Sequence, residues 1–291
     1  MRLLSRAKIN LFLRITGQRA DGYHTLFSLM ACLDLADTIE INPISNGISI
    51  NCDHPGVPCD ETNLACRAAR LFYDQTGIRR PGLSINIDKR IPVAAGLGGG
   101  SSNAAAVLKG LNHLYDHPLS RQTLMSLAPK LGADVPFFLM DSPALAEGIG
   151  EQLTPYRNLS SLPVVLIVPD IPVSTAEVYK SVDLGLTTGK KFSKLTSFTE
   201  KTYFDAGIHL ANDLERVTTA WHPRIKNIRN RLKALGAVGS LMSGSGPAVF
   251  GLFANTGAAA RAGRAFSEKS SNNAAERIYL TKILTGDAVT T

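Results

Sequence analysis

Four glycines and two serines lie close together in the segment PVAAGLGGGSS, and these residue types could bind a phosphate group. Gly96, Gly98, Gly99 and Gly100 follow the strand-like run LSINIDKRI, and an alanine-rich helical stretch comes directly after them. Glycine loses much conformational entropy on folding, so the cluster indicates a place where bare backbone is needed. Backbone N–H groups at a helix N-terminus, assisted by the helix dipole, bind anions. We therefore predict a phosphate-binding loop over residues 92–102 rather than a hairpin turn.

The spacing of this loop differs from that of two well-known phosphate loops. A P-loop carries a lysine followed by serine or threonine after its second glycine, and no lysine lies between Pro92 and Lys109. The dinucleotide-binding fingerprint needs a glycine three residues after its second one, where this chain has Ser101. The loop is therefore expected to bind phosphate without belonging to either group.

The composition indicates a globular protein with polyanionic ligands. The 291 residues are enough for two domains, and 44% hydrophobic with 19% charged residues argues against disorder. The formal charge of +7 fits a nucleic acid, a membrane surface or a phosphorylated substrate, and by itself it does not choose among them. The basic runs are short and lack interleaved aromatic residues, which favours solvated helix faces over a nucleic-acid patch.

The cysteines and the apolar runs indicate a cytoplasmic protein. Cys32, Cys52, Cys59 and Cys66 form no CxxC or CxxH pair, so their spacing does not match a zinc site. Four cysteines in a chain of this size are typical of reduced thiols in a cytosol. The longest apolar run, LPVVLIV, is too short to span a bilayer.

The hydrophobic pattern predicts strands and helices that mix without strict alternation, which favours an α+β fold in two domains. Strands are predicted over residues 7–15, 23–35, 37–44, 47–52, 83–91, 162–170 and 277–284, with two more strands in 238–253. Helices are predicted over 61–77, 101–116, 120–132, 209–221, 223–236 and 256–266. The strands 37–44 and 47–52 are expected to form a hairpin around Asn46-Gly47. The polar stretch Leu184–Thr202 is expected to be an exposed loop or linker.

Four stretches of the sequence together resemble the GHMP small-molecule kinases. PVAAGLGGGSSNAAA is similar to the motif that wraps the ATP phosphates, and MSGSGPAVF to the C-terminal glycine-rich motif. SRAKINLFL with RADGYHTL is similar to the N-terminal motif, and LGADVPFF to the segment with the catalytic aspartate. The resemblance implies an α+β architecture with an N-terminal, ATP-binding domain like ribosomal protein S5 domain 2 over 1–160. A ferredoxin-like C-terminal domain is implied over 161–291.

The resemblance assigns the chemistry to Lys8 and Asp134. Taken alone, Asp134 before Val-Pro would be a helix N-cap, and Lys8 would be an exposed lysine of an edge strand. The resemblance implies instead that Asp134 accepts the proton of the attacking hydroxyl or orients that hydroxyl. It also implies that Lys8 pairs with Asp134 and keeps it ionised. The two residues are far apart in sequence, so only the fold can bring them together.

The resemblance also implies two sets of binding residues. Those for ATP are Asn63, Lys89, Pro92, Val93, Ala94, Ala95, Gly96, Leu97, Gly98, Gly99, Gly100, Ser101 and Ser102. Those for the substrate are Asn10, Tyr23, His24, Tyr179, Gly244 and Ser245. Tyr23 and Tyr179 would stack on a cytosine and His24 would bond its edge. Mg²⁺ is implied through a serine hydroxyl, with its other ligands left open.

Three positions depart from the family pattern. Ala94 and Ala95 stand where some relatives carry glycine, and alanine still allows close backbone approach if φ is negative. Asn103 stands where many relatives carry aspartate, which puts in doubt any carboxylate role there.

The resemblance implies ATP-dependent phosphorylation of the 2-hydroxyl of a cytidine diphosphate-linked methylerythritol, in the non-mevalonate route to isoprenoid precursors. The expected partner is this small molecule, with no nucleic acid and no membrane; a homodimer stays open. The nearest alternative is a GHMP kinase that acts on an amino acid, a sugar or mevalonate. A basic RNA-binding protein would leave Asp134 and the phosphate loop without a role. An inactive sensor would not need both Lys8 and Asp134.

Overall fold

The computed structural model describes residues 1–78, 82–140, 142–183, 197–270 and 276–286. Its residues form two compact units. The first unit comprises Met1–Ala7, Leu35–Val93 and Gly98–Asp141, and the second comprises Lys8–Asp34, Ala94–Leu97 and Ser142–Thr291. Strands and helices mix in both units, which confirms the α+β class; the division at residue 160 stays a prediction.

Two long strands each contribute residues to both units. They are β1 (Arg2–Gln18) and β2 (His24–Ile44). β2 runs without a break through the two strands that the sequence predicts as separate. Along β1, Ile9 and Phe12 are both fully buried although they lie on opposite faces. The strand is therefore interior on both sides, including the side that carries polar residues.

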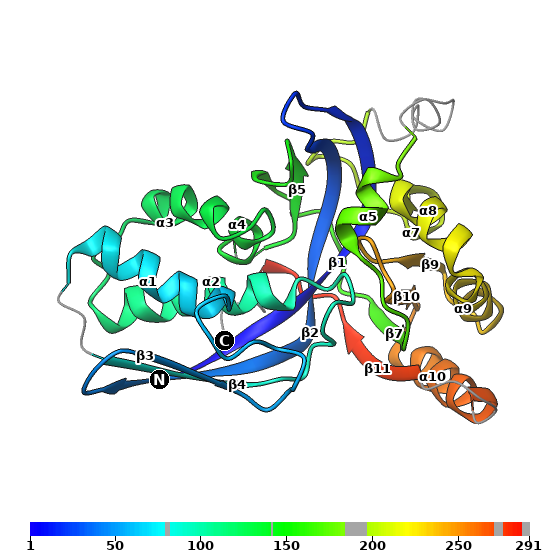
Figure 1. Cartoon of the computed structure of the whole chain (residues 1–291). Coiled ribbons are helices and arrows are strands. Elements are labelled where there is room, and N and C mark those ends of the chain that lie inside the picture. The colour runs from blue at the N-terminus through cyan, green and yellow to red at the C-terminus, as the bar shows by residue number, and fades with distance from the viewer. Residues whose placement is uncertain (79–81, 141, 184–196, 271–275, 287–291) are drawn as a thin grey trace. The chain divides into compact units, whose positions relative to one another are not determined.

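The first unit places two helices over a sheet. Its remaining elements are β3 (Ile48–Cys52), α1 (Leu64–Thr76), β4 (Gly82–Asp88), α2 (Gly99–Leu114), α3 (Arg121–Leu127), η1 (Ala128–Lys130) and α4 (Val135–Phe138). β4 pairs antiparallel with β2 and parallel with β3. Helices α1 and α2 pack against each other on one face of these strands (Figure 1). The Asn63 side chain caps α1, and Gly77, the last residue of the predicted helix 61–77, ends it in the left-handed conformation.

The hairpin predicted around Asn46-Gly47 is wrong, because β4 lies between β2 and β3. The turn itself forms, with φ +74° at Gly47, but it carries the chain across the end of β4. A Cβ atom on Gly82 would lie 2.5 Å from the Asn46 backbone nitrogen, so β4 begins directly against the turn. Alternating residues specify the faces of a strand but not its neighbour, which explains the error.

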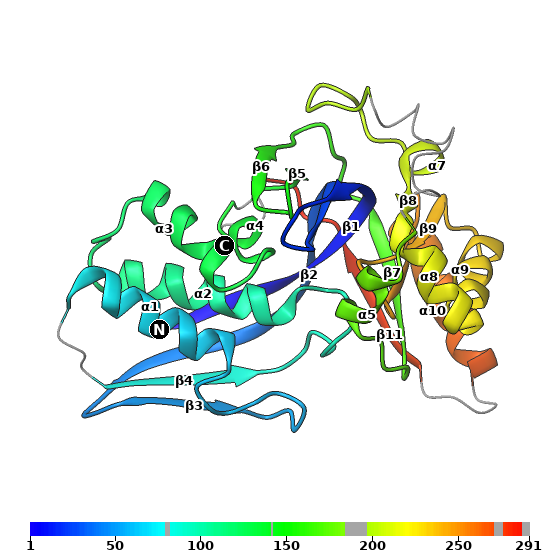
Figure 2. The ribbon, with the colours of Figure 1, turned by 45° about the horizontal axis from the view of Figure 1, so that its top comes forward.

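The second unit contains a four-stranded antiparallel sheet in the order β11-β7-β10-β9. Its remaining elements are β5 (Ala144–Glu147), β6 (Gln152–Pro155), β7 (Pro163–Pro169), α5 (Thr175–Lys180), α7 (Ala206–His209), β8 (Ala211–Asn212), α8 (Asp213–Trp221), α9 (Pro223–Ala234), β9 (Gly239–Met242), β10 (Val249–Leu252), α10 (Thr256–Ser270) and β11 (Glu276–Lys282). Helices α9 and α10 pack on this sheet (Figure 2). β8 adds to β1 in parallel, with Phe12 opposite Ala211.

The stretch predicted as an exposed loop over 184–202 is only partly described. Residues 184–196 lie outside the described residues. Phe198 is buried, with its ring centroid 5.1 Å from that of Phe12 and 5.6 Å from that of Tyr156. The expectation of exposure is wrong at this residue, because one aromatic side chain in a polar run anchors the segment to the core.

Candidate active site

Lys8 and Asn10 form a buried polar pair on β1 in the second unit, with 5% and 3% of their surface exposed. The Lys8 ammonium donates a hydrogen bond of 2.8 Å to Asn10 Oδ1. Asn10 Nδ2 donates to Ser28 Oγ at 2.9 Å, and that hydroxyl donates to a backbone carbonyl of β1 at 2.6 Å. A buried cation is costly unless it is hydrogen bonded. This excludes the interpretation of Lys8 as an exposed lysine, and it adds Ser28, which the sequence analysis missed.

The first half of the glycine-rich loop packs against the loop of residues 243–246 in the second unit. Ser243 Oγ donates to the Gly96 carbonyl at 3.0 Å, and the Lys8 amide donates to the Leu97 carbonyl at 2.9 Å. Gly96 has φ +75°, and a Cβ atom there would lie 2.3 Å from the Ser243 carbonyl oxygen. The absence of a side chain at Gly96 is therefore what lets the two glycine motifs meet.

Side chains from two other elements fix the 243–246 loop. Asn212 Nδ2 donates to the Gly244 carbonyl at 2.7 Å, while its Oδ1 caps α8. The hydroxyls of Thr175 and Ser245 share a hydrogen bond of 2.7 Å. A Cβ on Gly244 would lie 3.6 Å from Asn10 Oδ1, so the loop reaches the Lys8–Asn10 pair. Of these residues, Asn212 and Thr175 gave no signal in the sequence beyond ordinary helix capping.

A buried carboxylate supports the strand that leads into this loop. Glu215 on α8 accepts hydrogen bonds from Arg229 at 2.5 Å and from the Met242 amide at 3.2 Å. Burial raises the pKa of the Glu215 carboxyl, and the Arg229 ion pair opposes that shift. Through the Met242 amide, Glu215 therefore holds β9 to α8 immediately before Ser243.

Two of the three residues predicted to hold a cytosine come together in the second unit. The ring centroids of His24, at the start of β2, and Tyr179, on α5, lie 5.8 Å apart. His24 is buried, whereas Tyr23 lies at the preceding turn with 63% of its surface exposed. Tyr23 and His24 thus differ in exposure although they are adjacent in sequence, and Tyr23 has an accessible ring.

The second half of the glycine-rich loop begins helix α2 in the first unit. Gly98 is its N-cap with φ +71°, and no side chain caps the helix. The first-turn N–H groups of a helix have no partner within it, and such groups can bind an anion. Gly100 is exposed, whereas Ser102 is buried and accepts a hydrogen bond of 2.8 Å from Ser5 Oγ. Ser101 is the half-buried hydroxyl of the pair.

Asp134 begins the short helix α4 in the first unit, where it is half-buried. It has φ −82° and its side chain makes no capping hydrogen bond. The alternative interpretation of Asp134 as a helix N-cap therefore lacks the bond that defines such a cap. Lys8 belongs to the second unit, and its pairing with Asp134 stays a prediction.

The two residues predicted to flank the adenosine have structural partners in the first unit. Asn63 Oδ1 accepts from the Ala65 amide at 2.9 Å, and Asn63 Nδ2 donates to the Pro58 carbonyl at 2.7 Å. The Lys89 ammonium forms an ion pair with Asp37. Contact with a nucleotide would add to these roles, and it stays a prediction.

Ala94 departs from the conformation assumed for it. Its φ is +54°, so the condition of a negative φ is not met at this position. An alanine in the left-handed region costs about 1–2 kcal/mol of folded-state stability, which a glycine would recover. Glycine also gives the unfolded chain more conformational entropy, and this offsets about 0.4–1 kcal/mol of that gain. We expect Ala94→Gly to stabilise the protein by about 0.5–1 kcal/mol, measured as a higher midpoint in urea. A lower midpoint would contradict the strain.

Within the described part of the chain, no three His, Cys, Asp or Glu residues gather as a metal site would require. No helix there is long and apolar enough to cross a membrane.

Residues 63–142 match the GHMP kinases N terminal domain, and residues 202–272 match the GHMP kinases C terminal domain. A 4-diphosphocytidyl-2-C-methyl-D-erythritol kinase from Alkaliphilus metalliredigens is 44% identical over 89% of this chain and 90% of its own length. The crystal structure of a 4-(cytidine 5'-diphospho)-2C-methyl-D-erythritol kinase is 37% identical, with a TM-score of 0.80 over 98% of this chain and all of that one. A homoserine kinase from Cytophaga hutchinsonii shares the fold at a TM-score of 0.78 over 97% of this chain and 94% of its own, with 18% identity.

The chain belongs to the GHMP kinases, which confirms the resemblance and makes it an ATP-using phosphotransferase. Within that class it belongs to the family of 4-diphosphocytidyl-2-C-methyl-D-erythritol kinases. The homoserine kinase shows that the fold alone does not select the substrate.

Proposed function

We propose that the protein transfers the γ-phosphoryl group of ATP to the 2-hydroxyl of a cytidine diphosphate-linked methylerythritol. The observation that carries the proposal is the buried Lys8–Asn10 pair beside the Gly244 loop. An ammonium in the interior of a strand costs stability, so its retention indicates work on a polyanionic substrate. The family that shares these motifs over most of the chain supports the choice of substrate.

The proposed roles follow from what a loose phosphoryl-transfer transition state needs, which is positioning and charge stabilisation. The open N–H groups at the start of α2 bind the phosphates of ATP. Lys8 places positive charge near the transferred group, and Asn10 bonds the substrate. Asp134 accepts the proton of the attacking hydroxyl or orients that hydroxyl. It carries the single carboxylate of the LGADVPFF segment, and a carboxylate can accept a proton.

The cytosine is proposed to bind between Tyr23 and Tyr179, with His24 bonding its edge. The proximity of the His24 and Tyr179 rings supports this arrangement. The exposed ring of Tyr23 supplies a second stacking surface. Ser245 and Gly244 would border the polyol, since that loop reaches Asn10.

Mg²⁺ is proposed as the companion of ATP, where it would neutralise charge on the phosphate oxygens. The ion takes oxygen ligands and keeps several waters, so the Ser101 hydroxyl and a carboxylate fit as its protein contacts. The proposed compartment is the cytoplasm, which the four cysteines support because they form no disulfide with one another. The homodimer stays a prediction that light scattering on the 31.2 kDa chain tests.

A panel of acceptors tests the proposed substrate. We expect ADP release with ATP, Mg²⁺ and the cytidine diphosphate-linked methylerythritol, and none above background with homoserine, galactose or mevalonate. The reason is that a stacked and hydrogen-bonded base supplies binding energy that the small acceptors lack. Turnover with one of the other acceptors would keep the kinase class and contradict the roles of Tyr23, His24 and Tyr179.

A further inference from the structure

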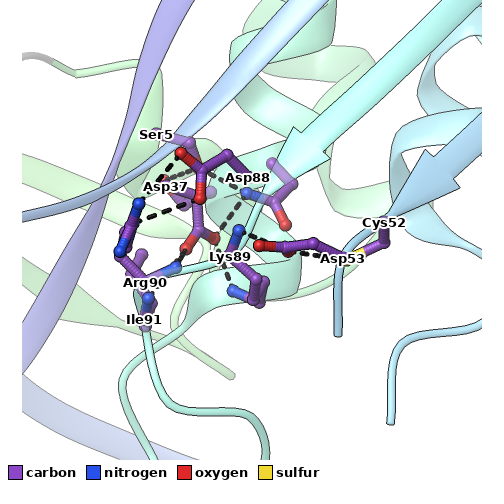
Figure 3. Close-up of polar contacts among 10 residues, drawn as sticks. Ser5, Asp37, Cys52, Asp53, Asp88, Lys89, Arg90 and Ile91 are labelled. Carbon is purple, nitrogen blue, oxygen red and sulfur yellow. Dashed lines mark hydrogen bonds and ion pairs between the residues drawn. The ribbon is translucent and has the colours of Figure 1, made fainter. Parts of the chain in front are cut away.

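Asp37 is a fully buried carboxylate in the first unit that the proposed chemistry does not use. It lies on β2, and Figure 3 shows its side chain among Lys89, Arg90 and Ile91, which follow β4. We call the following residues, all of which belong to the first unit, the Asp37 cluster: Ser5, Asp37, Lys89, Arg90, Ile91 and Asn103.

The carboxylate of Asp37 accepts four hydrogen bonds. The backbone amides of Arg90 and Ile91 donate to Oδ1 at 2.8 and 2.7 Å. Asn103 Nδ2 donates to Oδ2 at 2.9 Å, and the Lys89 ammonium forms an ion pair with the same oxygen. Two oxygens offer about four acceptor sites, so the group is fully used. Such saturation compensates the cost of burying a charge and fixes the group in place.

The partners of Asp37 stand at both ends of the glycine-rich loop. Ile91 immediately precedes Pro92, where the loop begins, and Asn103 lies in the first part of α2, where the loop has ended. From Asn103 the chain of bonds continues through Ser5 Oγ, at 2.8 Å, to the Ser102 hydroxyl, again at 2.8 Å. One buried carboxylate therefore joins the strand before the loop to the helix after it.

The same ion pair also places a cation against the helix start. A Cβ atom on Gly99 would lie 2.9 Å from Lys89 Nζ and 3.3 Å from the side chain of Ile91. The Lys89 side chain is only 4% exposed, so Asp37 holds its ammonium inside, directly beside the first helical residue. Asp37 consequently holds the ammonium beside Gly99.

We propose that Asp37 is a positioning residue for ATP, which aligns the N–H groups of the glycine-rich loop and sets the place of the Lys89 ammonium. This inference rests on the proposed binding of ATP phosphates at the start of α2. Phosphate binding by backbone amides depends on their alignment, so a carboxylate that contacts no ligand can control it. A buried ion pair by itself is poor evidence for stability, since apolar residues of similar volume often serve as well.

The first test is ADP affinity measured by calorimetry, which does not depend on the second substrate. We expect Asp37→Asn to weaken ADP binding by about tenfold or more, because hydrogen bonds to a charged acceptor are among the strongest. The KM for ATP should rise in parallel, while the KM for the cytidine substrate stays within about twofold. A merely structural role would lower the melting temperature without separating the two KM values.

A second variant covers the case in which Asp37→Asn fails to fold with an unpaired Lys89. Asn103→Ala keeps every charge and removes the hydrogen bonds that join α2 to Asp37 and to Ser5. We expect Asn103→Ala to weaken ADP binding severalfold. Where the double variant folds, adding Asp37→Asn to Asn103→Ala should weaken ADP binding less than Asp37→Asn does in wild type, because the effects of residues in one network are not additive. The control is Asp88→Asn, which removes the same charge from an exposed ion pair with the side chain of Arg90, whose backbone amide alone bonds Asp37.

The outcomes separate this inference from the proposed function. Wild type that binds no ADP would overturn both. Wild type that binds ADP, with both variants binding it equally well or more tightly, would overturn the role of Asp37 alone. Weakening of the same size in the Asp88→Asn control would also overturn it, because the effect would then be one of local charge.

Discussion

Asp134→Asn is expected to lower kcat by about 10²–10⁴-fold, the usual contribution of a positioned acid or base. The amide has the shape of the carboxylate, but it neither takes a proton nor carries the charge that would pair with Lys8. The side chain is half-buried and makes no capping bond to α4. Steady-state ADP release measures the loss, and ADP affinity should stay near that of wild type.

The matched control for this prediction is Asp88→Asn, which removes the same charge at an exposed site of the same unit. Its kcat should lie within about twofold of wild type, as expected for an exposed ion pair. An Asp134→Asn enzyme that kept kcat within about tenfold would contradict a role in proton transfer. The attacking hydroxyl would then have to be oriented by other groups.

Gly96→Ala is expected to cost about 2–5 kcal/mol of stability, from left-handed strain and from a clash together. The strain arises because φ is +75°. The clash arises because the new Cβ would lie 2.3 Å from the Ser243 carbonyl oxygen, which is backbone and yields only if the whole loop moves. Urea unfolding measures the loss of stability, and kcat/KM should fall with it because the two glycine motifs are forced apart.

Gly236→Ala separates the two causes. Gly236 lies in the second unit with φ +92°, and nothing lies within 4 Å of the position of its Cβ. It should therefore show the strain alone, about 1–2 kcal/mol, with unchanged kcat/KM. Equal losses in the two variants would mean that the contact between Gly96 and Ser243 does not matter for stability.

The sequence was most informative where a local pattern determines local structure. The predicted helix 120–132 begins at Ser120, which caps α3, because a Ser side chain bonds the first free amides wherever the helix lies. Strand pairing was the weak point, as the false hairpin at Asn46-Gly47 shows. Which strands become neighbours depends on the whole sheet, and alternation in one strand does not contain that information.

The same limit applies to the candidate site. The glycine motifs and Lys8 stand out by composition or by contrast with their neighbours. Ser28 and Asp37 do not, since a serine or an aspartate in a strand of mixed residues has no distinctive spacing. Their importance comes from burial and from partners distant in sequence, such as Asn103 for Asp37. The mutual closeness of His24 and Tyr179 was implied only by the family resemblance.

The division of the long strands between the units limits how this enzyme could be dissected or recombined. A gene fragment that stopped at residue 160 would keep β1 but lose β8, its parallel neighbour, and would leave Gly96 without Ser243. The complementary fragment would keep the 243–246 loop without Lys8 or Asn10. Neither piece is a module that carries its own part of the chemistry. Chimaeras between related kinases should therefore exchange the N-terminal strands together with the C-terminal loop, as one inherited set.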